Sequence, residues 1–345
     1  MTARERVIRC LTFAGPDRVP RQLWALPGVS MFRQEELELV QRRFPPDFAG
    51  PEVRYGPAKR AHGVRGEVGT YVDEWGCVWQ VAEPGVVGEV KEPPLADWLA
   101  LAHFEPPWEI LEEADFSQVN ESCAATDKFV LAGTTVRPFE RMQFLRGTEN
   151  LFIDLAYGTP EVYRLRDLVH EFFCRELEMW VRTDVDGISF MDDWGAQNAL
   201  LLHPQLWREF FKPLYKDYCD LIRGRGKFVF VHSDGYIEPV YPDLIELGVH
   251  AINSQLFCMD IEELGRKYRG KITFWGEIDR QWLLPFGTPA HVRQAVKRVR
   301  RALDTGRGGV IAQCEFGLRD PVENILAVFE AWEEGNEGRR LNPDG

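Results

Sequence analysis

Short apolar runs alternate with longer amphipathic stretches from residue 128 onward. The amphipathic stretches, at 159–183, 203–223, 236–248, 260–269 and 288–305, have the spacing of helices. Several of them begin with a proline at the first helical position, as at Thr159-Pro160 and Thr288-Pro289. The apolar runs between them are Phe129–Ala132, Gly187–Met191, Phe228–Val231, Ala251–Ile252, Ile272–Trp275 and Gly309–Ala312. Strands that alternate with helices predict βαβ units and a parallel sheet.

The first third of the chain adds one helix and two strands to this pattern. We expect an N-terminal helix over 2–14, because Thr2 and Glu5 have the spacing of a capping box. Residues 19–26 predict a short buried strand, and a further strand is expected between about 50 and 80. With the six later runs this makes eight strands, which favours a (β/α)8 TIM barrel in the α/β class. The alternative is an open doubly wound sheet, but no GxGxxG or GxxxxGK[ST] sequence follows any strand.

Residues 69–91 have a different pattern and are predicted to form a β-hairpin insertion. Aromatic and β-branched residues flank a Pro-Gly turn in this segment. At about 150 residues per domain, the length of 345 residues allows two domains. Because the predicted strands run from Val19 to Cys314, we instead expect a single domain over 1–345 with a short C-terminal tail at 337–345.

Composition and charge restrict the partners of this chain. There are 41 basic and 54 acidic residues, a formal net charge of −13, which argues against nucleic acid or an anionic membrane as the main partner. Seven cysteines without a CxxC pair predict reduced thiols and a cytoplasmic protein. We expect neither a signal peptide nor a membrane span, because no stretch approaches roughly 18 apolar residues.

Acidic, imidazole and thiol side chains follow the predicted strands. In an α/β barrel the carboxyl ends of the strands converge on one pocket, so these side chains are candidates for a site. The simpler reading is that strand ends are polar because loops contact water. The candidates at strand ends are Asp192, Asp193, Trp194, His232, Asp234, Gln255, Glu277 and Cys314.

His232, Asp234 and Cys314 form the sharpest combination. Imidazole, carboxylate and thiolate together suit Zn²⁺, whose catalytic sites use three protein ligands and keep one position open. A structural role for His232, as a hydrogen-bonding residue, is the alternative. Because Asp192 and Asp193 are adjacent on a strand, one is expected to face the pocket and the other to cap the helix that follows.

The other candidates concern substrate binding. An Arg21 side chain inside the barrel would bind a substrate carboxylate, although a salt bridge at the barrel floor explains it as well. Asp73 and Glu74 lie in the predicted hairpin and are candidates for a lid over the pocket. Trp194 and Gln255 are candidates for substrate contact, and Glu277 for acid–base catalysis or as part of the pocket wall.

Taken together, these segments resemble the uroporphyrinogen decarboxylase superfamily. The resemblance rests on the order and spacing of RERVIRCLTFAGPDRVP, DEWGCVW, GISFMDDWG, KFVFVHSDGY, WGEIDRQW and QCEFGLRDPVENI. It implies a (β/α)8 barrel and an enzyme acting on a small molecule. Homodimers are common in this superfamily, so the resemblance is compatible with a homodimer.

One branch of this superfamily consists of corrinoid-dependent methyltransferases. They bind zinc through His-x-Cys after the fifth strand and a Cys after the eighth, which implies His232, Asp234 and Cys314 as ligands here. A carboxylate in place of one thiolate favours activation of an oxygen-borne methyl group. Asp192 or Asp193 would then orient the substrate. Because the chain lacks a DxHxxG motif, a corrinoid would arrive on a partner protein.

The other branch contains the true decarboxylases, which remove carboxyl groups without a metal. They carry an MRQAGRY-like segment after the first strand, where this chain reads PRQLWALPGVSMF and retains only Arg21 and Gln22 of that pattern. A carboxy-lyase and a non-catalytic ligand-binding barrel are therefore the alternatives to a methyltransferase.

Overall fold

The computed structural model describes residues 1–334, and the expected tail at 337–345 lies outside the described residues. Within that range, eight parallel strands follow one another in the order β1-β11-β10-β9-β8-β7-β6-β2. The backbone N–H of Asp47, just before β2, donates to the carbonyl of Arg21 on β1 at 2.9 Å and links the two ends of this order. The predicted (β/α)8 barrel is therefore confirmed. The strands are β1 (Arg21–Ala25), β2 (Phe48–Ala49), β6 (Phe129–Gly133), β7 (Gly187–Met191), β8 (Phe228–Ser233), β9 (Ala251–Ser254), β10 (Thr273–Trp275) and β11 (Val310–Phe316).

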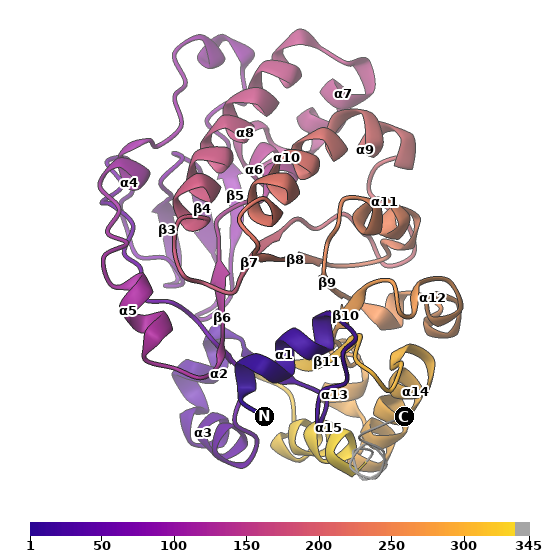
Figure 1. Ribbon diagram of the computed structural model, residues 1–345. Coiled ribbons are helices and arrows are strands. Elements are labelled where there is room, and N and C mark those ends of the chain that lie inside the picture. Colours follow the sequence, from indigo (N-terminus) through magenta and orange to yellow (C-terminus); the bar gives the residue numbers. More distant parts are fainter. Residues whose placement is uncertain (335–345) are drawn as a thin grey trace.

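Helices surround the barrel on its outer side (Figure 1). Their starts follow local signals: Thr288 accepts from the N–H of His291 at the start of α14, and Asp260 accepts from the N–H of Glu263 at the start of α12. The helices outside the barrel are α2 (Pro27–Phe32), α3 (Gln34–Arg43), α4 (Glu109–Glu112), α5 (Val119–Ala124), α6 (Pro138–Arg146), α7 (Thr148–Tyr157), α8 (Pro160–Trp180), α9 (Pro204–Phe210), α10 (Lys212–Arg223), α11 (Tyr241–Glu246), α12 (Ile261–Tyr268), α13 (Leu283–Phe286), α14 (Pro289–Leu303) and α15 (Val322–Glu334).

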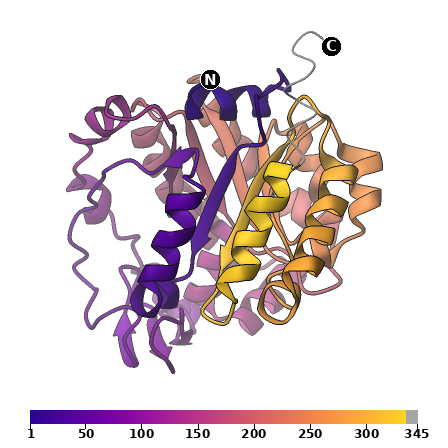
Figure 2. The same ribbon diagram turned by 90° about the horizontal axis from the view of Figure 1, so that it is seen from below.

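Helix α1 (Ala3–Leu11) closes the end of the barrel at which the strands begin (Figure 2). Its capping box is formed as predicted, with Thr2 and Glu5 exchanging hydrogen bonds. Val7 and Leu11 pack into the same apolar cluster as Phe129 and Phe230, which fill the barrel interior. The opposite end, where the strands finish, is therefore the end left for a site.

The predicted hairpin insertion is a three-stranded antiparallel sheet. It contains β3 (Gly69–Val72), β4 (Val78–Val81) and β5 (Glu89–Glu92), in that order. The expected second barrel strand, placed between about 50 and 80, is in fact the two-residue β2 just before that range. A strand of two residues carries no readable alternation, which explains the displaced prediction.

Alternation along each barrel strand assigns every side chain to one of two layers. On β8, Phe228 and Phe230 belong to the interior cluster, whereas Val229 and Val231 pack in the outer layer between strands and helices. On β11, Ile311 belongs to the interior. The residues that continue the interior rows beyond the aromatic layer are the ones that reach the mouth of the barrel.

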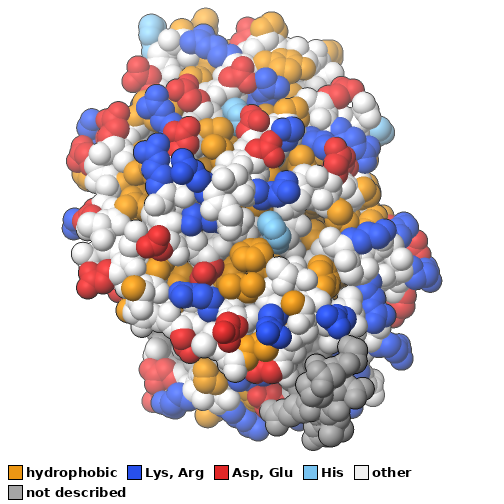
Figure 3. Space-filling model, in the orientation of Figure 1, with side chains coloured by type: hydrophobic (Ala, Val, Ile, Leu, Met, Phe, Trp, Pro, Cys, Tyr) orange, Lys and Arg blue, Asp and Glu red, His pale blue; other side chains and the backbone are white. Residues whose placement is uncertain are grey.

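The face that carries α1 displays acidic, basic and apolar side chains in a mixed arrangement (Figure 3). Among the described residues no helix is long and apolar enough to cross a membrane. None of the seven cysteines, which all lie within residues 1–334, forms a disulfide.

Candidate metal centre at the mouth of the barrel

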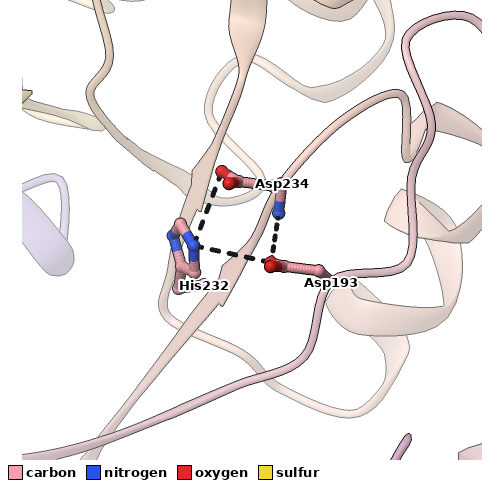
Figure 4. A group of neighbouring side chains, drawn as sticks. All are labelled: Asp193, His232 and Asp234. Carbon is pink, nitrogen blue, oxygen red and sulfur yellow. Dashed lines mark hydrogen bonds and ion pairs between the residues drawn. The ribbon is translucent and has the colours of Figure 1, made fainter. Parts of the chain in front are cut away.

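Asp193, His232 and Asp234 come together where β7 and β8 end. Asp193 is the second residue after β7, His232 lies near the end of β8, and Asp234 follows β8 directly (Figure 4). His232 and Asp234 continue the interior row of β8 because they are two residues apart. One ligand atom from each residue lies within 4.8 Å of the others. Both carboxylates point toward the same ring nitrogen: Nε2 of His232 is 3.7 Å from Asp193 Oδ1 and 3.5 Å from Asp234 Oδ1.

A hydrogen bond to Asn253 orients the imidazole of His232. Asn253 Oδ1 lies 2.6 Å from His232 Nδ1, and the amide nitrogen of Asn253 donates to the carbonyl oxygen of Trp275 and to Gln313. Because the carbonyl of Trp275 can only accept, the amide oxygen of Asn253 must face the ring. His232 Nδ1 therefore carries a proton, so Nε2 is the nitrogen that faces the two carboxylates and that can bind a metal.

The donor set and its spacing fit a divalent cation. The separations of 3.5 and 3.7 Å are long for hydrogen bonds. They approach the distance of about 3.3 Å between neighbouring ligands around a tetrahedral Zn²⁺ with ligands at about 2 Å. Oδ1 of Asp234 is buried and has no hydrogen-bond partner, so the cluster contains an acceptor that the protein does not satisfy. One imidazole and two carboxylates are ligands that Zn²⁺ accepts.

Further carboxylates and one arginine surround the cluster. Arg280, in the loop after β10, forms ion pairs with Asp234, with Glu315 at 3.0 Å and with Glu277 at 3.5 Å. Burial raises the pKa of Glu277 to about 8. Burial, followed by the negative charge of Asp234, also raises the pKa of Asp193. A bound cation would relieve this repulsion between carboxylates.

Two glycines hold the ligand-bearing loops close together. The N–H of Gly195 donates to the carbonyl of Asp234 at 3.1 Å, and the N–H of Asp234 donates to Asp193 Oδ1 at 2.9 Å. Gly235 has a positive φ of 77°, and a Cβ there would collide with the carbonyl of Gly195. Gln255 Oε1 accepts from the N–H of Gly235 at 2.7 Å. The two carboxylates are thus fixed by the backbone, and Gln255 supports this arrangement from β9.

Two residues predicted for the site lie in the outer layer. The sequence predicts Cys314 as the third ligand, but Cys314 alternates with Ile311 and Gln313 and packs, fully buried, among the outer-layer residues. The sequence also leaves open which of two adjacent aspartates faces the pocket. Asp192 faces outward and accepts from the N–H groups of Phe139 and Glu140 in the first turn of α6, at 3.0 and 2.9 Å. It therefore caps α6, which follows β6, and not the helix after β7 as the sequence predicts, whereas Asp193 faces the pocket.

Arg21 and Trp194 also lie away from the barrel interior. Arg21 forms a 2.7 Å ion pair with Glu333 of α15 and so faces the helices, where it cannot bind a substrate inside the barrel. Trp194 is buried in the outer layer, stacked on Phe139 at 4.5 Å. Both positions follow from the alternation of side chains along a strand. Arg21 is three residues from Trp24, which faces inward, and Trp194 is next to Asp193, which faces the pocket.

The hairpin residues Asp73 and Glu74 border a pocket beside the cluster. Asp73 accepts hydrogen bonds from the N–H groups of Trp75 and Cys77, from the indole of Trp79 and from Arg141. Its acceptors are therefore occupied within the protein, and its role here is to hold the hairpin. Glu74 forms a 3.5 Å ion pair with Arg141. The pocket has a volume of about 450 Å³.

Sequence reasoning missed Glu140 and Arg280 around the cluster. It reached Asn253 by the strand-end rule and Arg137 as a candidate arginine of the decarboxylase alternative, but gave neither a role in a metal site. Glu140 and Arg137 lie at the start of α6, where a Pro138 start signal drew attention to the helix and not to its side chains. Asn253 follows the apolar pair of β9, so the same strand-end rule that selected His232 applies to it. Arg280 lies in a loop whose path the sequence does not indicate.

The chain matches a family pattern and superposes on a solved structure over nearly its whole length. The sequence pattern of the family described as "Uroporphyrinogen decarboxylase (URO-D)" matches residues 74–335. A solved structure titled "methyltransferase from Methanosarcina mazei" superposes with a TM-score of 0.71 at 16% identity, covering 97% of this chain and 99% of that chain. A 3-keto-D-glucoside 4-epimerase from E. coli gives a TM-score of 0.40 at 11% identity, covering 71% of this chain and 97% of that chain. No curated protein matches the sequence.

Proposed function

Because this chain belongs to the uroporphyrinogen decarboxylase family, we propose that it is a zinc-dependent methyltransferase with two substrates. One is a small molecule with an oxygen-linked methyl group, and the other is a corrinoid carried by a partner protein. The observation that carries this proposal is the cluster of Asp193, His232 and Asp234 at the catalytic end of the barrel. The methyltransferase title of the solved structure that covers 97% of this chain supports it.

His232 and the two aspartates would hold the metal. His232 offers Nε2 because Asn253 holds the proton on Nδ1, and Asp234 offers the buried Oδ1 that has no hydrogen-bond partner. When bound, zinc supplies Lewis acidity that polarises the oxygen carrying the methyl group. Arg280 neutralises part of the negative charge on Asp234 and so limits repulsion within the ligand set.

Glu140 is placed to manage the proton of this reaction. In such a transfer, the bond between methyl carbon and oxygen would break with its electron pair left on the oxygen, and a reduced corrinoid would be the methyl acceptor. The leaving oxygen would then need a proton. Burial, together with the charge of Asp193, raises the pKa of Glu140 to about 7, and Glu140 Oε2 has no hydrogen-bond partner. Glu140 can therefore release a proton to that oxygen near neutral pH.

Two alternatives remain as outcomes of the test. A metal-free decarboxylase would need arginines that hold substrate carboxylates: Arg21, the one that resembles the decarboxylase segment, is paired with Glu333 on the outside, whereas Arg137 lines the pocket beside the cluster. A non-catalytic barrel would bind its ligand equally well without His232. We further propose that the enzyme works in the cytoplasm, where seven free thiols remain reduced.

Metal content and methyl transfer together test the proposal. Zinc is measured in the purified wild type and in the variants His232→Ala, Asp193→Asn and Asp234→Asn, with Cys314→Ala as a matched control. We expect about one zinc per chain in the wild type and in the Cys314 variant, and a loss in the other three. Methyl transfer is followed by the visible spectrum of added cob(I)alamin, which replaces the partner-bound corrinoid. A metal-free wild type with full activity would contradict the proposal.

A further inference from the structure

The pocket of about 450 Å³ lies between the three-stranded sheet and the first turn of α6. One wall comes from the sheet and includes Trp79 and Val87. The other wall comes from the barrel and α6 and includes Arg137, Glu140 and Phe144. A volume in this range accommodates a small organic molecule.

The pocket opens beside the metal ligands because Asp192 anchors the first turn of α6. The carboxylate of Asp192 accepts from the backbone N–H groups of Phe139 and Glu140, and the next residue is the ligand Asp193. This places Glu140 near the cluster, and the charge of Asp193 acts on its carboxyl group. Glu140 is therefore the residue of the pocket wall that lies toward the cluster.

The three arginines that line the pocket differ in their ion pairs with acidic side chains. Arg141 is neutralised by Asp73 at 2.9 Å and by Glu74 at 3.5 Å. The nearest acid to Arg137 is Glu140 at 3.9 Å, which is beyond hydrogen-bond distance. Within residues 1–334, Arg65 has no ion pair with an acidic side chain. The donors of Arg137 and Arg65 are therefore available to a ligand.

Two buried polar atoms in the pocket wall also lack a hydrogen-bond partner. They are Oε2 of Glu140 and Nε of Arg141, and the side chain of Arg141 is 8% exposed. Buried polar groups are normally satisfied, and each unsatisfied one costs about 1–3 kcal/mol. These atoms indicate that the pocket receives a polar ligand, which is an observation independent of the arginines.

We propose that this pocket binds the substrate through an anionic group, a carboxylate or a phosphate, which Arg137 holds with Arg65. The apolar part of the molecule lies against Val87 and Phe144. Its other end reaches the Asp193–His232–Asp234 cluster; this last assignment rests on the proposed function. An arginine guanidinium is suited to carboxylate and phosphate because it offers paired N–H donors in one plane.

Calorimetric titration of the purified protein with three small probes tests this assignment. The probes are phenylacetate, benzylphosphonate and the neutral isostere phenylacetamide, none of which carries a transferable methyl group. We expect an anionic probe to bind wild type at least about ten-fold more tightly than the amide. The tighter of the two anions identifies the group as carboxylate or phosphate.

Four variants locate the anion. In Arg137→Met the preference for the anion should disappear, and in Arg137→Lys it should be partly retained. Arg9→Met, an exposed change on α1 at the opposite end of the barrel, should keep it and serves as the matched control. His232→Ala should also keep it, because the anion is held by arginine and not by the metal.

Several results would overturn this inference. They are equal binding of amide and anions to wild type, an unchanged preference in Arg137→Met, and loss of the preference in His232→Ala. The outcome is separate from that of the proposed function, because binding of these probes requires neither zinc nor methyl transfer. A protein without zinc that retains the Arg137-dependent preference would refute the methyltransferase and leave the anion site standing.

Discussion

Asn253 determines which nitrogen of His232 faces the carboxylates, through a 2.6 Å contact between Asn253 Oδ1 and His232 Nδ1. Removing that acceptor frees the ring to rotate and to change tautomer. We expect Asn253→Ala to lower zinc affinity by about 10- to 100-fold, as is typical for residues that support a metal-binding histidine. Competition with a chromophoric chelator measures this change.

The neighbouring Ser254 provides the control for this prediction. Ser254 faces the other side of β9 and hydrogen-bonds to Tyr241. Ser254→Ala removes a hydrogen bond of the same strand, but in the outer layer, and should leave zinc affinity unchanged. Equal affinities of wild type and the Asn253 variant would show that the ring needs no such support.

Substitutions at the adjacent residues Asp192 and Asp193 should have different effects: the first should lower the stability of the fold, and the second should weaken metal binding. Asp192→Asn replaces an oxygen that accepts a backbone N–H of α6 by an NH₂ group, so we expect a loss of about 1–3 kcal/mol in the free energy of unfolding. Asp193→Asn keeps an oxygen for the N–H of Asp234 and should change this free energy by less than about 0.5 kcal/mol. Urea unfolding without metal compares the two, and similar losses would contradict the assigned roles.

The close contact between Gly195 and Gly235 predicts a position-specific effect of an added methyl group. Gly235→Ala requires a positive φ and also forces apart the loops that carry Asp193 and Asp234, so zinc should be lost. Gly226→Ala is the matched control, because Gly226 has a φ of 69° and open space around its Cβ position. The control should lose about 1 kcal/mol of stability and bind zinc normally. Zinc retained by the Gly235 variant would show that the contact is dispensable.

His250 predicts how stability depends on pH at the opposite end of β9. Burial, with the charge of Arg223 adding to it, lowers the pKa of His250 from 6.5 to about 4, and Nδ1 accepts from the N–H of Val229 at 3.0 Å. Between pH 6.5 and 4 the unfolded chain then binds more protons than the folded one, so stability falls as the pH falls. At about 1.4 kcal/mol per unit, this residue accounts for at most about 3.5 kcal/mol.

The variant His250→Asn isolates this contribution. An asparagine oxygen can still accept from Val229 but does not titrate, so the loss of stability from pH 6.5 to 4 should be smaller than in wild type. Unfolding in urea at several pH values provides the comparison. Parallel curves for the two proteins would assign the acid sensitivity to other groups.

The barrel was predictable from the sequence because its strands are apolar runs separated by helices with clear starts. Strand β2 was misplaced because two residues do not establish a pattern. Within the site, His232 and Asp234 were found together because they lie two apart on one strand. The two faces of β11 were harder to tell apart, since Gln313 and Cys314 are both plausible pocket residues and only the register shows which one turns inward.

The residues that sequence reasoning missed depend on contacts between distant segments. Arg280 meets Asp234 across a separation of 46 positions, and Asp192 meets α6 across more than 50. No sequence motif marks Arg280 or the first turn of α6 as a partner of these aspartates, and rules based on neighbouring residues do not reach across such separations. The register of the strands and the paths of the loops supply this information.

All three proposed ligands come from the ends of two neighbouring strands, β7 and β8. The loops after β1, β2, β10 and β11 contribute none of them. Those loops can therefore change in length and sequence during evolution while the three proposed ligands keep their positions. We expect related proteins with this fold to differ in the hairpin and in the arginines beside it, and so to act on different substrates. The three proposed ligands would then be the part of the site that these proteins share.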